Sequence, residues 1–496
     1  MEVINFTTLL LFSSLIFLLI KAWRKPQNPN PQNLPPSPPS LPVIGHLHLL
    51  GGGAVPALAR LKKKYGPIIS LKLGEVTAVV ISSREATKEA LKIHDPACAD
   101  RPDSTALEIM FYSYGDIAFC PYNEYWRQMR KICILEMLSA KNVKSYGYIR
   151  AEEIDSLVES LRLSSGEAVN ITEKISSLTF AITCRASFGR VLKGHAKLIA
   201  LLKELSTMAG GFEVADLFPS LTFLHPFSLN KYRLLRMRRE MDAILDPAVE
   251  EHKLKKSGEF EGEDFVDVLL RVQKNKELQF PITTDNIKSI ILDMFAGGIE
   301  TTATTTDWAM AELMRNPRVM TKVQSEIREA LKGKTTVENK DVQNLKYLKL
   351  VVKESLRLHP PIPLLPRKCR QECKVGAFTI PNKAKVMIDV HSLGRDPQYW
   401  NDPETFLPER FEESSLDFLG SNYEFLPFGA GKRNCPGINF GIANVEFPLA
   451  QLLYHFDWKL PQGMSHADVD MTEIEGLAVL RKNPLMVIPT PYEQPL

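Results

Sequence analysis

A glycine-rich segment that ends in a single cysteine constrains this chain more than any other feature. It reads Phe-Gly-Ala-Gly-Lys-Arg-Asn-Cys-Pro-Gly over residues 428–437, and an apolar helical pattern follows it to about residue 455. A cysteine at the start of a helix meets the positive end of the helix dipole and free N–H groups, which lower a thiol pKa. Glycines let the backbone turn tightly and approach a flat ligand. The segment predicts Cys435 as a thiolate ligand, with Arg433 placed to pair with a ligand carboxylate.

Alone, a cysteine beside a glycine turn is more often an ordinary buried residue. Here the ten residues fit Phe-x-x-Gly-x-Arg-x-Cys-x-Gly without departure, and they resemble the haem-binding signature of the cytochromes P-450. The resemblance implies haem b whose iron is ligated by Cys435. It also implies that Phe428, Arg433 and Gly437 contact the haem.

A second pattern lies on a helix predicted over residues 345–358. Glu354 and Arg357 stand at i and i+3 and share a helical face. Alone, they would be a solvated surface ion pair. The family has this pair together with an arginine in a later Pro-Glu-Arg-Phe segment, which is present here at 408–411. The resemblance implies a buried structural triad of Glu354, Arg357 and Arg410 behind the haem.

The longest predicted helix, over residues 284–316, is weakened at one place. Gly297 and Gly298 are adjacent, at a cost of about 1 kcal/mol each relative to alanine, and several threonines follow. We expect a local distortion there. The segment resembles the family's oxygen-binding groove, which implies that Thr301 hydrogen-bonds dioxygen and Glu300 relays protons. The alternative is a flexible helix with a glutamate on its surface.

Two further segments resemble haem-propionate contacts of the family. Trp126 and Arg130 lie at i and i+4 and would donate to one propionate, and Arg367 follows a proline at the place of a further propionate-binding arginine. By position in the family, we expect a largely apolar substrate pocket, although each member could instead be plain core. The expected pocket residues are Thr105, Phe111, Phe212, Asp293, Ala296, Gly297, Thr301, Ile362, Leu365, Ala478 and Val479.

The N-terminus predicts a membrane anchor. Residues 3–20 are largely apolar and would span about 27 Å as a helix, just enough for a thin bilayer. Lys21, Arg24 and Lys25 follow, which argues that this end stays cytosolic. A cleaved signal peptide is the alternative, but the basic segment that should precede its apolar run is missing. The expected divisions are an anchor over 1–25, a Pro-rich hinge over 26–45 and one catalytic domain over 46–496.

Composition excludes several other classes. With 44% hydrophobic and 24% charged residues and a net charge of +3, the chain is neither disordered nor a nucleic-acid binder. Seven cysteines form no disulfide framework and fit a reducing compartment. Cys369 and Cys373 lack a further pair or a histidine at zinc spacing, so no metal site is expected at them. Helical periodicity dominates, which predicts a mainly α fold with small β-sheets, the haem-thiolate fold of the family.

The resemblance covers nearly the whole chain, and the chain is similar to plant microsomal enzymes. Residues 41–48, 122–130 and 450–456 look closest to mint-family terpene hydroxylases that act on limonene or on thymol precursors. This implies NADPH-dependent monooxygenation of a small hydrophobic metabolite at the endoplasmic reticulum membrane, with the catalytic domain in the cytosol. No flavin or NADPH motif is visible, so the electrons would come from the membrane-bound NADPH–cytochrome reductase. Its docking residues would be Arg127, Lys131 and Lys432.

Other functions remain open at this level. The same chemistry could act on a flavonoid, an alkaloid or a fatty acid, because wider plant relatives act on each. A haem-thiolate isomerase or dehydratase would use no reductase, but such enzymes usually lack both the anchor and the acid–threonine pair. A non-catalytic haem sensor is disfavoured by the intact pair of Glu300 and Thr301.

Overall fold

The computed structural model describes nearly all of the chain that follows the hinge. The residues described are 13–14, 33–208, 214–221, 228–254, 263–275, 278–334, 337–476 and 478–493. Most of the predicted anchor, residues 26–32 of the hinge and Phe212 therefore lie outside the described residues. Within the described part, no helix combines the length and the apolar character needed to cross a membrane.

Helices make up most of the fold and short strands form small sheets, which confirms the predicted class. The α-helices are α2 (Ala54–Tyr65), α3 (Arg84–Lys88), α4 (Thr105–Met110), α5 (Glu124–Ile132), α6 (Ala140–Ser145), α7 (Gly147–Leu163), α8 (Ile171–Phe188), α9 (His195–Met208), α10 (Val214–Leu217), α11 (Leu229–Leu254), α12 (Phe265–Lys274), α13 (Thr284–Phe295), α14 (Thr301–Arg315), α15 (Pro317–Ala330), α16 (Asn339–Val342), α17 (Lys346–Leu358), α18 (Val390–Leu393) and α19 (Ile438–His455). The strands are β1 (Ile68–Leu73), β2 (Val76–Ile81), β3 (Val169–Asn170), β4 (Leu364–Lys368), β5 (Cys373–Val375), β6 (Phe378–Ile380), β7 (Lys385–Asp389), β8 (Phe456–Lys459), β9 (Glu473–Glu475), β10 (Val479–Arg481) and β11 (Met486–Pro491).

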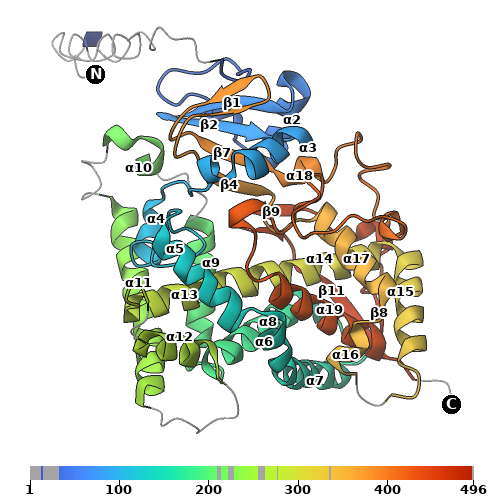
Figure 1. Ribbon diagram of the computed structural model, residues 1–496. Helices are drawn as coiled ribbons and strands as arrows, with labels where there is room; N and C mark the ends of the chain where they lie inside the picture. Colours follow the sequence, from blue (N-terminus) through green and yellow to red (C-terminus); the bar gives the residue numbers. More distant parts are fainter. Residues whose placement is uncertain are drawn as a thin grey trace, which may run out of the picture.

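The largest sheet lies at one end of the molecule, above the helices in Figure 1. Its strand order is β1-β2-β7-β4. β1 and β2 form a hairpin, and Gly74 turns between them at a φ of +62°, which favours glycine. β7 runs parallel to β2, and β4 pairs antiparallel with β7. The sheet therefore fixes β4, which carries Leu365 and Arg367 toward the cavity described below.

The longest predicted helix is present, and it is distorted where its glycines lie. α13, a π-helical turn η6 (Ala296–Glu300) and α14 follow one another without a break. A Cβ atom on Gly298 would lie 3.4 Å from Thr183 Oγ1 and 3.5 Å from the Phe440 ring. The widened turn therefore lies against α8 and α19, with room for no more than a small side chain at Gly298.

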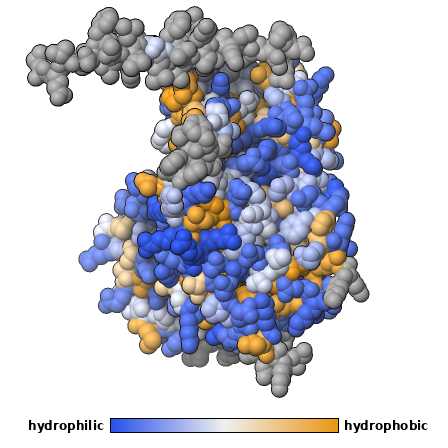
Figure 2. Space-filling view, turned by 90° about the vertical axis from the view of Figure 1, so that its left-hand side faces the viewer, coloured by the Kyte–Doolittle hydropathy of each residue, from blue (hydrophilic) through white to orange (hydrophobic). Residues whose placement is uncertain are grey.

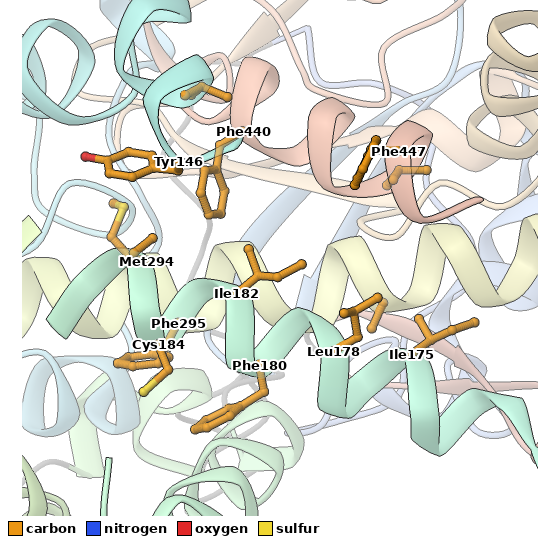
Figure 3. Packing of buried hydrophobic residues seen from close by; sticks show 14 of the residues in the cluster. Tyr146, Ile175, Leu178, Phe180, Ile182, Cys184, Met294, Phe295, Phe440 and Phe447 are labelled. Atoms are coloured by element: carbon orange, nitrogen blue, oxygen red, sulfur yellow. The ribbon is translucent and has the colours of Figure 1, made fainter. Parts of the chain in front are cut away.

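Apolar packing holds the helix that follows the cysteine segment. Phe440 and Phe447 of α19, labelled in Figure 3, are buried in the main hydrophobic cluster together with Ile175, Leu178 and Ile182 of α8. Buried aromatic side chains contribute large apolar areas to such a cluster. α19 itself packs directly on α7, α14 and α15, and this packing sets the entry of the cysteine segment.

The predicted charged triad forms behind the cysteine segment. Arg357 donates to both carboxylate oxygens of Glu354 at 2.8 Å, and Arg410 Nε donates to Glu354 Oε1 at 3.0 Å. The side chains of Glu354 and Arg357 are fully buried. Arg357 Nη1 also donates to the carbonyls of Gly394 and Pro403. The triad thus ties α17 to the segment that precedes the cysteine loop.

Hydrophilic residues predominate on the face shown in Figure 2, and apolar residues form small separate groups on it. Three apolar residues directly after the Pro-rich segment are also exposed: Leu41, Val43 and Ile44. Val43 is the most exposed of them, with 54% of its surface accessible to solvent. Single exposed apolar residues are normal on a water-facing surface. Three exposed apolar residues within four positions form a candidate contact with a membrane or another apolar surface.

Candidate active site

A cavity of about 300 Å³ opens between the long helix and the cysteine segment. Cys435, Phe428 and Gly437 contribute to its wall from the cysteine segment, and Gly297 and Thr301 contribute from the long helix. Its apolar lining residues include Ile117, Phe119, Leu138, Met294, Ile362, Leu365, Ile442 and Val445. The structure therefore brings the two strongest sequence motifs to one space.

The cysteine loop is held in place by its own backbone and by one aspartate. The N–H of Cys435 donates to Phe428 O at 2.9 Å. Gly431 has a φ of +70°, and a Cβ atom there would lie 2.7 Å from Asp95 Oδ1. The N–H of Lys432 donates to Asp95 Oδ2 at 2.7 Å. Glycine is required at this position because the aspartate approaches the loop so closely.

The protein alone makes the Cys435 thiol less acidic than usual. Burial raises its pKa, and the N–H of Gly437 and the charge of Arg130 oppose that effect only in part. The helix α19 begins at Ile438, so Cys435 lies just before the first helical turn. For the chain by itself, burial therefore outweighs the lowering of the pKa that the loop N–H and Arg130 supply. A coordinated metal ion deprotonates a thiol outright and supplies the missing positive charge.

Four arginines line the cavity: Arg101, Arg130, Arg367 and Arg433. Burial lowers the pKa of each guanidinium, to about 10 for Arg367 and Arg433. Among the residues described, Arg367 Nε is buried without a hydrogen-bond partner. All four donate to carbonyls close by: Arg101 to Pro366 at 2.6 Å, Arg130 to Asn434 at 2.6 Å, Arg433 to Ala99 at 2.7 Å and Arg367 through Nη2 to Ala430 at 3.4 Å. So many buried cations fit a ligand with more than one negative charge.

Trp126 lies behind this cluster and not in the cavity wall. Its Nε1 donates to Ile117 O at 2.9 Å, and the guanidinium groups of Arg130 and Arg433 lie 5.3 and 4.4 Å from its ring. The contact seen for Trp126 is thus to the protein backbone, and its ring positions two cavity arginines. Arg101 had no sequence signal, because nothing around it distinguishes it from an exposed arginine.

Thr301 and Glu300 lie at the end of the widened turn. The hydroxyl of Thr301 donates to the carbonyl of Gly297 and lines the cavity. Glu300 does not line it, and its Oε2 accepts a hydrogen bond from Ser206 Oγ at 2.9 Å. Burial raises the pKa of Glu300, and the bond from Ser206 opposes this. Ser206 has no motif around it and was found only through this contact.

The expected pocket residues divide into two groups. Asp293, Ala296, Gly297, Thr301, Ile362 and Leu365 line the cavity. Four of the other described residues do not contribute to the cavity wall: Thr105 donates to Asp216 at 2.9 Å, Phe111 packs on the lining residue Phe119, Val479 N donates to Pro361 at 2.9 Å, and Ala478 is buried. Their part in a substrate pocket stays a prediction.

Asp293 has a structural contact within the cavity wall. Its Oδ2 accepts from the N–H groups of Ile117 and Ala118 at 2.6 and 3.3 Å. Burial raises the pKa of Asp293 well above its usual range, and the buried carboxyl of Asp116 adds to this. Asp293 therefore fixes the backbone of a lining segment, which a position in the sequence could not reveal.

Known proteins match this chain over nearly its full length. The family sequence model named Cytochrome P-450 matches residues 35–488. Cytochrome P-450 71D13 of Mentha piperita is 60% identical over 96% of this chain and 95% of its own length. Cytochrome P-450 71D180 of Thymus vulgaris is 54% identical over 98% of both chains. A zebrafish cytochrome P-450 solved with abiraterone has a TM-score of 0.75 at 25% identity, covering 88% of this chain and 98% of its own.

The residues around the cavity fit haem b. Cys435 offers a sulfur ligand, the glycine loop leaves room for a flat ring, and the buried arginines match two propionate groups. Members of the matching family use this cofactor with a cysteine thiolate, and they receive electrons from NADPH through a reductase. The chain belongs to the cytochrome P-450 family of haem-thiolate monooxygenases.

Proposed function

We propose that this enzyme inserts one oxygen atom into a terpenoid. The observation that carries the proposal is the apolar lining beside Cys435, in which Phe119, Met294 and Ile362 offer no charged partner. Such a wall favours a hydrocarbon-like substrate that is held by shape. The resemblance to mint-family terpene hydroxylases and the close relatives from Mentha and Thymus support the same substrate class.

Each part of the site has a proposed task. Bound to Cys435, the haem supplies the oxidising chemistry, which the electron-rich thiolate favours. The arginines hold the propionates, with Arg367 Nε as a free donor. The lining residues orient the substrate and keep water out. Thr301 can turn its hydroxyl from Gly297 toward the cavity, and Glu300, whose pKa is raised by burial, would relay protons from behind it.

A substrate panel tests this proposal. The chain is co-expressed with a plant NADPH reductase and given mono-, sesqui- and diterpenes together with flavonoids, and products are identified by mass spectrometry. We expect an NADPH-dependent gain of one oxygen on a terpene, and none with the Cys435→Ser variant. Turnover of flavonoids alone would reject the terpenoid substrate and keep the reaction type.

Replacing Thr301 with valine should separate NADPH use from product formation. The variant keeps the shape of the side chain and loses the hydroxyl, so product per NADPH should fall about tenfold or more, with a matching rise in peroxide. The matched control is Thr304→Val, because the hydroxyl of Thr304 is buried without a hydrogen-bond partner in the described structure. If both variants formed the same amount of product per NADPH, Thr301 would have no part in proton delivery.

The Ser206→Ala variant should move the pH dependence of coupling, the amount of product formed per NADPH, to higher pH. The Ser206 hydroxyl stabilises the charged form of Glu300, so its loss should raise the carboxyl pKa further. The part of the pH profile that is due to Glu300 then shifts to higher pH, and product per NADPH between pH 5 and 9 measures the shift. Ser206→Thr keeps a hydroxyl and should leave this part of the profile near its original place. A shift of the same size with threonine would contradict this role.

We place reductase docking at Arg127, Lys131 and Lys432, which are exposed near the cysteine side of the cavity. Their change to glutamine should slow electron transfer about tenfold at low salt, because steering by opposite charge is lost. Added salt should reduce the difference, and the haem spectrum should stay unchanged. Stopped-flow reduction measures the rate, and unchanged rates would reject the surface. The matched control neutralises three exposed cations elsewhere: Arg236, Lys197 and Lys340.

We also propose a single-pass anchor over residues 1–25, a hinge over 26–45 and a catalytic domain over 46–496 that faces the cytosol from the endoplasmic reticulum. The exposed group of Leu41, Val43 and Ile44 supports a membrane contact next to the hinge. Deleting residues 1–25 should weaken membrane association, as measured by fractionation in high salt. Unchanged pelleting of the shortened chain would point to another anchoring surface.

A further inference from the structure

Three cysteines from distant parts of the chain meet at one point. Cys98 ends the 3-10 turn η3 (Asp95–Cys98), Cys369 follows β4, and Cys373 begins β5. The sulfur of Cys98 lies 3.1 Å from that of Cys369 and 3.7 Å from that of Cys373, and all three sulfurs lie within 4.8 Å of one another. Each residue is at most 7% exposed. The cluster takes no part in the reaction site described above.

Three convergent sulfurs suit a metal ion better than a disulfide. Zinc–sulfur bonds of about 2.3 Å in a tetrahedron place sulfur atoms roughly 3.8 Å apart, so the 3.7 Å pair fits as it stands and the 3.1 Å pair would have to open on binding. A disulfide would join two of the sulfurs and leave a third buried thiol beside the bond. Three convergent thiols also match the donor type that thiophilic cations prefer. Sequence spacing alone does not indicate the cluster, because Cys98 lies far from the other two cysteines in the chain.

We propose that Cys98, Cys369 and Cys373 bind a thiophilic divalent cation, Zn(II), as three thiolates. Binding releases three thiol protons to solvent and leaves the three thiolates and the ion with a net charge of −1. Arg367 acts electrostatically on Cys98, so a positive charge lies near the site. Water would complete the tetrahedron.

The bound ion would fasten together two segments that shape the haem cavity. The N–H of Lys368 donates to Asp100 O, and the N–H of Arg370 donates to Ala97 O, both at 2.8 Å. Ala99, next to Cys98, accepts from the cavity residue Arg433 at 2.7 Å. Zinc between these segments should hold the cavity arginines in place. The proposal stands without the terpenoid assignment, since it concerns a site outside the substrate cavity.

Metal content of the haem-loaded enzyme tests the proposal. The protein is reduced with a phosphine, stripped with a chelator, loaded with ZnCl₂, passed through a desalting column and measured by mass spectrometry of metals. We expect one zinc per haem in the parent and in Cys184→Ser, a matched control whose thiol is buried in α8. The isosteric variants Cys98→Ser and Cys373→Ser should lose this zinc while keeping the reduced carbon-monoxide spectrum.

Two results would overturn the site. One is a reduced parent that retains no stoichiometric zinc. The other is zinc content that is the same in the Cys98→Ser and Cys373→Ser variants as in the parent. Peptide mapping of protein purified without reductant adds an independent check, because a Cys98–Cys369 disulfide together with absent zinc would assign the cluster to thiol oxidation. The parent enzyme loaded with zinc should also lose its haem at a higher temperature than the zinc-free parent enzyme. The two serine variants should show no such difference.

Discussion

Serine in place of Cys435 is expected to abolish NADPH-dependent oxygen insertion. A hydroxyl is a far weaker acid than a thiol and gives the iron no electron-rich sulfur, so O–O cleavage is no longer favoured. Product formation per haem should fall by about a thousandfold or more, below detection in an ordinary assay. The measurement is product per bound haem in the presence of reductase, with haem content determined separately.

The Cys184→Ser variant provides the control for this experiment. Cys184 is buried in α8, where its sulfur accepts from the N–H of Leu192, and it does not line the cavity. Its serine variant should keep near-parental turnover. Retention of more than a tenth of the activity in Cys435→Ser would mean that another group ligates the iron, and the site would need to be reassigned.

Replacing Glu354 with glutamine should destabilise the fold strongly. The change keeps the shape of the side chain but leaves Arg357 as a fully buried cation without its carboxylate partner. Loss of one member of a buried ion pair costs about 3–5 kcal/mol. We therefore expect a large drop in the denaturant midpoint and a low yield of haem-loaded protein.

An exposed glutamate gives the comparison for Glu354. Glu152 pairs with Arg185, yet its side chain is 58% exposed, so Glu152→Gln should change the free energy of unfolding by less than about 1 kcal/mol. Denaturant titrations of both variants, followed by the haem absorbance and by circular dichroism, measure the difference. Equal shifts would show that the buried pair contributes no more than a surface pair.

Local patterns predicted the main elements well. The weakened long helix was expected from two adjacent glycines and the threonines after them, and the π-helical turn lies at that place. The charged triad was expected from two short motifs, and its hydrogen bonds are present. Both features depend on residues close in sequence or on side chains whose burial needs a partner. Such signals survive in the sequence because local physics requires those residue types.

Features that depend on contacts between distant segments could not be predicted. Ser206 meets Glu300 across two helices, and Cys98 meets Cys369 through a loop beside β4. Phe111 and Val479 were expected in the cavity wall, but neither lines the cavity; Phe111 packs on Phe119, and the N–H of Val479 donates to Pro361. The orientation of a side chain toward a cavity is decided by tertiary packing, which position in a family pattern does not specify. The net direction of the Cys435 thiol pKa likewise depends on burial, which outweighs the N–H of Gly437 and the charge of Arg130.

The π-helical turn sets where the long helix tolerates a change in chain length. A π-helical turn holds one residue more than an α-helical turn, so a deletion within 296–300 can be absorbed by closing the turn, with the register of α14 kept. In α14 every residue from 302 to 314 is buried, and each residue of a helix advances the chain by about 100°. A deletion within α14 would therefore turn the buried side chains that follow it away from their neighbours on all sides at once. Closing the π-helical turn would instead remove the widened backbone beside the cavity and leave the core aligned.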